Sequence, residues 1–146
     1  MSSGITKVFD ENDAVGLGRL VRDRQVKPSE LVEEANRRIE TLNPTINAVC
    51  IKTYDYARRA AGDAALPDGP FKGVPFVLKD LGTLWQGIPT TNCCPFTKGI
   101  VADSDMEYVR RIKRSGVVLV GKSNSPEFGW SLATAAAAPP DDPPVL

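Results

Sequence analysis

Two lysines follow short apolar runs, and both are candidates for chemistry. Lys79 and Asp80 come directly after residues 74–78, and Lys122 follows residues 117–120. Lys79 either extends its ammonium group to solvent, pairs with Asp80, or acts as a buried base. The last role needs deep burial, which lowers a lysine pKa by about 3–5 units.

The chain has no histidine among its 146 residues, and this limits the mechanisms open to those side chains. A Ser-His-Asp or Cys-His pair and a histidine-ligated metal site are excluded within the chain. The 18 basic and 18 acidic residues give a net charge of zero, so no overall field attracts nucleic acid or an anionic membrane. We expect no metal, no cofactor and no nucleic-acid partner.

The three cysteines, Cys50, Cys93 and Cys94, form no CxxC pattern. An odd cysteine count without a signal peptide argues against a secreted disulfide scaffold. No apolar run approaches the roughly 18 residues that a membrane span needs. We therefore expect three reduced thiols in a cytoplasmic protein that does not enter the membrane.

The segment from Gly116 to Ser123, GVVLVGKS, matches the P-loop pattern GxxxxGK[ST]. A P-loop curls its four intervening residues around phosphate and begins a helix at the lysine. Here those residues are Val-Val-Leu-Val, which favour a strand, and Pro126 disfavours a long helix. Nucleotide binding is retained only as an alternative.

The first half of the chain has mainly helical patterns. We expect a loose start over residues 1–9, then a helix from about residue 12, and a second helix that begins at Pro28 and ends at Asn43-Pro44. A short strand within residues 46–51 and a helix over residues 54–65, capped by Thr53, should follow.

The second half has the pattern of a βαβ unit. Residues 74–78 and 117–120 are apolar and of strand length, and a helix between them should be capped by Asp103 or Ser104 and end at Gly116. Near-continuous apolar strands are typical of a parallel sheet that is buried on both faces. We therefore predict an α/β fold: N-terminal helices, then the first βαβ part of a mixed or parallel sheet with helices on both faces.

This topology brings the polar groups to one edge of the sheet. Lys79 and Asp80 leave the carboxyl end of one strand, and Lys122, Ser123 and Asn124 leave the carboxyl end of the other. Open α/β folds build their sites at this edge. The sequence therefore predicts that these side chains share a site.

Several segments together resemble the amidase signature family. They are GVPFVLKD, GIPTTN, ADSD and GVVLVGKSNSPEFG, preceded by the helical segment VKPSELVEEANRRIETLNPTINAV, and the resemblance covers about residues 10–134. It implies hydrolysis of linear carboxylic amides by a Ser–Ser–Lys triad, without a cofactor, on a small amide substrate. By the same resemblance, Lys79 matches the catalytic lysine, and Asp80, Thr90, Thr91 and Asn124 support the geometry of the surrounding loops.

The sequence departs from the family after its EFG segment. Members of the family have two glycine-rich, serine-containing stretches there, whereas this chain continues into an Ala/Pro-rich segment. We expect residues 1–134 to be the N-terminal part of an amidase domain, incomplete relative to the family fold, and residues 135–146 to be a disordered tail. The chain should be a truncated hydrolase without activity. The alternative is a binding or assembly fragment that pairs with a missing half or self-associates through an uncovered sheet edge.

Overall fold

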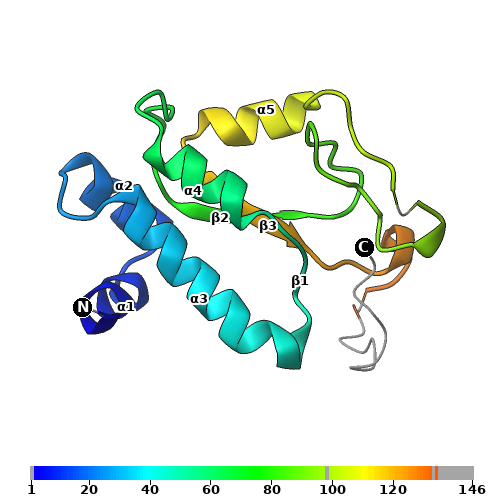
Figure 1. Cartoon of the computed structure of the whole chain (residues 1–146), viewed down its shortest axis with the longest axis horizontal. Helices are drawn as coiled ribbons and strands as arrows, with labels where there is room; N and C mark the ends of the chain where they lie inside the picture. Colours follow the sequence, from blue (N-terminus) through cyan, green and yellow to red (C-terminus); the bar gives the residue numbers. More distant parts are fainter. Residues whose placement is uncertain (1, 98, 133, 135–146) are drawn as a thin grey trace.

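The computed structural model describes residues 2–97, 99–132 and 134 (Figure 1). The tail expected over residues 135–146 lies outside the described residues. Within the described part, the helices and strands follow one another in the order α1 (Ser2–Glu11), α2 (Ala14–Arg22), α3 (Pro28–Ile46), β1 (Val49–Lys52), α4 (Tyr54–Gly62), β2 (Pro75–Lys79), η1 (Pro95–Thr97), α5 (Glu107–Arg114), β3 (Val118–Ser123) and η2 (Glu127–Gly129), where η marks a short 3-10 helix.

The three strands form one mixed sheet in the order β1-β3-β2. β2 and β3 are parallel, with Phe76 opposite Leu119, and α5 lies between them in the chain. β1 pairs antiparallel with β3 and approaches it closely, since a Cβ atom on Gly121 would lie 2.4 Å from the carbonyl oxygen of Ile51. The predicted α/β fold with its βαβ unit is confirmed.

Helices cover both faces of this sheet (Figure 1). Side chains of β3 alternate between the faces, as the period of two in a strand requires. Val118 and Val120 pack with residues of α3 and α4, whereas Leu119 packs with Val109 of α5. The continuously apolar sequence of β3 is therefore explained by burial on both sides.

A further apolar cluster joins the N-terminal helices to the sheet. Leu17 and Val21 of α2 pack with Leu31 of α3 and with Val74, just before β2. Partly buried side chains of α1 also pack on this cluster: Ile5, Val8 and Phe9. The loose start expected over residues 1–9 was therefore wrong, because tertiary contacts fix a helix whose local signals are weak. Among the described helices, none is both long and apolar enough to cross a membrane.

Some of the predicted helix boundaries were also wrong. α3 continues through Pro44 to Ile46 and ends at Asn47, whose φ of 44° is left-handed. Thr53 precedes α4, but its hydroxyl donates to the carbonyl of Leu119 instead of capping the helix. α5 begins after Met106, which has no side-chain cap. Gly116 does follow α5 in a left-handed conformation, with φ of 91°.

Candidate active site

The buried lysine at the edge of the sheet is Lys122. β3 carries it into the interior, where its side chain is 0% exposed. Its ammonium nitrogen lies 2.7 Å from Thr90 Oγ1, 2.7 Å from the carbonyl oxygen of Pro89 and 3.0 Å from that of Thr83. It is also 3.2 Å from Asp80 Oδ1. Burial lowers the pKa of Lys122, and the adjacent Asp80 carboxylate opposes this effect.

The Asp80 carboxylate is fully buried and has hydrogen-bond partners besides Lys122. It accepts hydrogen bonds from the backbone N–H of Thr91, at 3.1 Å to Oδ2, and from the Thr91 hydroxyl. The Thr90 hydroxyl donates to the carbonyl of Thr83 and accepts from Lys122. These bonds fasten the loop after β2 to β3, and they supply the partners that a buried charge requires.

The P-loop alternative does not fit this arrangement. Residues 118–123 are a strand paired on both sides, so they provide no ring of free N–H groups for a phosphate. The lysine of the pattern, Lys122, is already surrounded by acceptors from the loop after β2. A phosphate could reach it only if that network opened.

Lys79 is not buried, although a buried base was one of the roles that the sequence left open for it. It ends β2 and its side chain is exposed. Its carbonyl accepts a hydrogen bond from the Thr83 hydroxyl. Asp80, which was considered as its ion-pair partner, pairs with Lys122 instead. The ammonium group of Lys79 has no carboxylate partner among the described residues.

The remaining candidate, Asn124, lies outside the Asp80 network. Its side chain donates to the carbonyl of Asn47 at 3.2 Å and accepts from the backbone N–H of Ser125 at 2.8 Å. It therefore ties the end of β3 to the connection between α3 and β1. The structure brings together Asp80, Thr90 and Thr91, and leaves Lys79 and Asn124 at the margins of this cluster.

Sequence reasoning placed Lys122 at the sheet edge and in the P-loop pattern, but it missed the burial of this lysine in the core. A usable signal was present, because a lysine in a strand buried on both faces needs a buried acid nearby. Asp80 follows the neighbouring parallel strand and meets that requirement. The second missed residue, Thr83, contributes a carbonyl from an irregular loop, for which we find no sequence signal.

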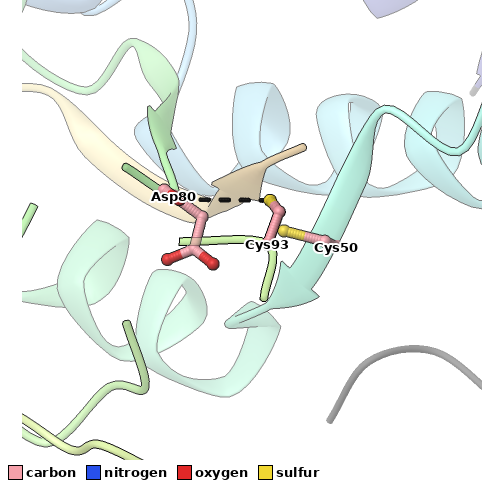
Figure 2. Close-up of side chains that lie close together, drawn as sticks. All are labelled: Cys50, Asp80 and Cys93. Atoms are coloured by element: carbon pink, nitrogen blue, oxygen red, sulfur yellow. Dashed lines mark hydrogen bonds between the residues drawn. The ribbon is translucent and has the colours of Figure 1, made fainter. Parts of the chain in front are cut away.

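One group of potential metal ligands lies next to the network. Cys50, Cys93 and Asp80 each place a ligand atom within 4.8 Å of the others (Figure 2). The Asp80 carboxylate, however, already faces the buried ammonium group of Lys122. A metal cation there would be repelled by that charge, so the arrangement does not favour a metal centre.

The fold and these motifs agree with a known family. The amidase family model matches residues 30–138, which is more than half of the chain. The chain therefore belongs to the amidase family, and in particular to its amidase signature members.

Individual relatives support this membership. The chain is 38% identical to a 6-aminohexanoate-cyclic-dimer hydrolase of Paenarthrobacter ureafaciens over 92% of this chain and 27% of the relative. It is 35% identical to a lipoamidase of Enterococcus faecalis over 84% of this chain and 18% of the relative. It thus spans about a quarter or less of the length of these relatives.

Solved structures give the same result. A structure of 6-aminohexanoate cyclic dimer hydrolase superimposes with a TM-score of 0.73 and 39% identity, over 80% of this chain and 24% of the other. A bacterial aryl acylamidase of the amidase signature family superimposes with a TM-score of 0.71 and 32% identity, over 80% and 26%. The fold described above is therefore part of the amidase fold.

Proposed function

We propose that this chain is the lysine-bearing segment of a hydrolase that breaks the C–N bond of carboxylic amides, with Lys79 as the base. The observation that carries the proposal is the position of Lys79. It ends β2 with its side chain exposed, directly before Asp80 and the hydrogen-bonded loop. The base is thus accessible, whereas the other lysine at this edge, Lys122, is occupied inside the core.

In the proposed reaction, a serine attacks the amide carbon while a second serine passes the proton to Lys79. The proton then goes to the leaving amine, and water releases the acyl group from the first serine. Asp80, Thr90 and Thr91 would position Lys79 through the loop, and Asn124 would hold the adjacent end of β3. None of these four is assigned contact with the substrate.

We propose further that the chain by itself does not hydrolyse amides. Its sequence contains no glycine-rich stretch with the two serines of the triad. Loss of one member of a catalytic triad already lowers the rate by several orders of magnitude.

A segment exchange tests the role of Lys79. Residues 10–134 would replace the matching segment of the 6-aminohexanoate-cyclic-dimer hydrolase, and hydrolysis of the cyclic dimer would be measured. We expect the chimera to be active and Lys79→Ala to reduce kcat by at least about 10³-fold. Asp55→Ala, a change at an exposed residue of α4, is the control and should leave kcat unchanged.

Two results would contradict the proposal. An active chimera that keeps its rate after Lys79→Ala would show that this lysine is not the base. Amide hydrolysis by the isolated chain that disappears in the same variant would show that the chain is complete as a catalyst.

A second candidate function is assembly with another polypeptide or a second copy. It is favoured by large apolar side chains that remain exposed near η1 and η2. Phe96 is 96% exposed and Trp130 is 90% exposed. Phe128 is bonded through its N–H to the carbonyl of Asn92, which brings η2 to the loop that carries η1 (Figure 1). Exposed apolar groups gathered in this way are typical of interfaces.

Size-exclusion chromatography with light scattering tests the assembly function. We expect a concentration-dependent dimer that becomes a monomer in the double variant Phe96→Ser/Trp130→Ser. A wild-type chain that stays monomeric at every concentration, alone and with the remainder of a related amidase, would contradict it.

A further inference from the structure

Two cysteine sulfur atoms lie together beside the Lys122–Asp80 pair. Figure 2 shows the side chains of Cys50 and Cys93 directed toward each other, and their sulfur atoms are within 4.8 Å. Cys50 belongs to β1, whereas Cys93 lies in the loop after β2, 43 residues further along the chain. The contact is therefore made by the tertiary structure and does not follow from a local CxxC turn.

Two irregular backbone features place these sulfur atoms. β1 contains a bulge at Cys50, because Val49 pairs with Ser123 while Ile51 pairs with the adjacent Lys122. Bulges redirect the side chain of the extra residue, and here the Cys50 sulfur lies 3.5 Å from the carbonyl oxygen of Lys122. Cys93 has a left-handed conformation with φ of 53°, which is uncommon for a residue with a side chain.

The two sulfur atoms have different surroundings. The Cys93 sulfur accepts a hydrogen bond from the backbone N–H of Ser125 at 3.2 Å, and it interacts with the Cys50 thiol. The Cys50 thiol lowers the pKa of Cys93 most, and the Ser125 N–H and the charge of Lys79 lower it further. The same contact with Cys93 is the main cause that raises the pKa of Cys50. Of the two sulfur atoms, Cys93 is therefore the one whose surroundings favour the thiolate.

We propose that Cys93 and Cys50 are an oxidative modification site, at which hydrogen peroxide converts the two thiols into a disulfide between the loop after β2 and strand β1. The proposal does not depend on amide hydrolysis or on the role of Lys79. It rests on the distance between the sulfur atoms, on the bulge and on the Ser125 hydrogen bond.

The reaction balances in two steps. The Cys93 thiolate attacks one peroxide oxygen, so that an S–O bond forms, the O–O bond breaks and the released hydroxide takes up a proton as water. The Cys50 sulfur then attacks the Cys93 sulfenic acid, forms the S–S bond and releases a second water molecule. In total, two thiols lose two electrons and two protons, and one peroxide is reduced to two waters.

The geometry is compatible with closure. A disulfide needs a sulfur separation of about 2.05 Å, so the sulfur atoms must approach by at most about 3 Å. Cys93 is in a loop and both thiols are partly exposed, so rotation of the side chains and a small loop movement are available. Conversion of Cys93 to the sulfenic acid also ends the thiol contact that raises the pKa of Cys50, which helps the second step.

Cys94 supplies an internal control. It neighbours Cys93, but its side chain is only 1% exposed. Interaction with Glu127 raises the pKa of Cys94, which keeps the thiol protonated. Because the thiolate is the reactive form, Cys94 should react with neither peroxide nor alkylating agents on the timescale of Cys93.

Oxidation of the wild-type chain, followed by alkylation and peptide mass spectrometry, tests the proposal. After tryptic digestion, peroxide should yield two linked peptides, residues 39–52 with Cys50 and residues 80–98 with Cys93. Their combined mass should be lower by two hydrogens. The variant Cys94→Ser should give the same link, and this assigns it to Cys93. In Cys50→Ser, a sulfenic acid at Cys93 should be trapped by dimedone, and without peroxide Cys93 should be alkylated at least about tenfold faster than Cys94.

Several outcomes would overturn the proposal. They are Cys50 and Cys93 remaining reduced under peroxide, a link that is lost in Cys94→Ser, and a link found only between separate chains. Binding of one zinc ion per chain that protects both thiols from alkylation would show a metal site instead. The wild-type arm needs no substitution, and fragmentation of the linked peptides between residues 93 and 94 assigns the sulfur even where a variant fails to fold.

Discussion

The ammonium nitrogen of Lys122 lies 3.2 Å from Oδ1 of Asp80, and both side chains are fully buried. A buried ion pair of this kind adds little net stability over an apolar pair, but the loss of one partner leaves an uncompensated charge. The pair joins β3 to the first residue after β2. It therefore fixes the loop that begins next to Lys79.

Replacement of Lys122 by methionine should strongly destabilise the chain. The variant Lys122→Met leaves the Asp80 carboxylate buried without its cation, at a cost of about 3–5 kcal/mol. The free energy of unfolding from urea titration followed by circular dichroism measures this change. Lys79→Met is the matched control, because that lysine is exposed, and it should change the free energy of unfolding by less than about 0.5 kcal/mol. Equal losses in the free energy of unfolding for the two substitutions would contradict the conclusion that Lys122 compensates the buried charge of Asp80.

The Thr91 hydroxyl should also contribute through Asp80. Thr91→Val keeps the shape of the side chain but removes a donor to the buried carboxylate, which should lower the free energy of unfolding by about 1–3 kcal/mol. Thr41→Val serves for comparison, since the hydroxyl of Thr41 donates to a helical carbonyl of α3. A loss no larger for Thr91→Val than for Thr41→Val would show that the Thr91 hydroxyl adds nothing to the support of Asp80.

The close approach of β1 to β3 should tolerate no side chain at Gly121. In Gly121→Ala the new methyl group would lie 2.4 Å from the carbonyl oxygen of Ile51. We expect a loss of about 2 kcal/mol or more in the free energy of unfolding, because the clash exceeds the gain of about 0.5–1 kcal/mol from a less flexible unfolded chain.

Gly62→Ala is the control for that substitution. Gly62 ends α4, and apart from its chain neighbours and the backbone of its own helix, no atom of the described residues lies within 4 Å of the added methyl group. The free energy of unfolding of Gly62→Ala should equal that of the wild type or exceed it by about 0.5 kcal/mol. Thermal unfolding of the two variants under one buffer condition measures the contrast, and a stable Gly121→Ala variant would require a different pairing of β1.

Glu34 should make the stability depend on pH in the acidic range. Its buried carboxylate accepts hydrogen bonds at 2.8 Å from Arg37 and Arg38 of the same helix, and Arg37 contributes most to lowering its pKa from 4.5 to about 2. Since the pKa in the folded state is the lower one, the stabilisation is complete above about pH 4.5 and is lost as the pH falls toward 2.

The difference in the free energy of unfolding between the wild type and Glu34→Gln separates the contribution of Glu34 from that of the other carboxylates. Because Arg37 is half exposed, solvent weakens the interaction, and we expect a difference of about 1–3 kcal/mol at pH 6 that disappears near pH 2. Urea titrations at a series of pH values give both curves. If the free energies of unfolding of the two proteins change with pH in parallel over the whole range, the protonation of Glu34 is not coupled to folding.

Parts of the fold could be predicted because they depend on local pattern. The apolar runs before Lys79 and before Lys122 are short, β-branched and bounded by glycine or proline, and they form the parallel strands β2 and β3. Helix α1 was missed although Ile5, Val8 and Phe9 have the i, i+3, i+4 spacing of an amphipathic helix. The stretch is ten residues long, with no acidic residue in its first turn and no basic residue in its last, so it depends on packing against the cluster formed by α2 and α3.

The sequence by itself determined the strand–helix–strand order, the family motifs and the position of Lys79 and Lys122 at the same ends of neighbouring strands. Only the tertiary structure decided which lysine is buried, since this depends on the loop after β2 folding over Lys122 with Asp80, Thr83 and Thr90. It also decided that Cys50 meets Cys93, through a bulge and a left-handed residue. Local pattern indicates where a strand lies, but the partners of its side chains come from residues distant in the chain.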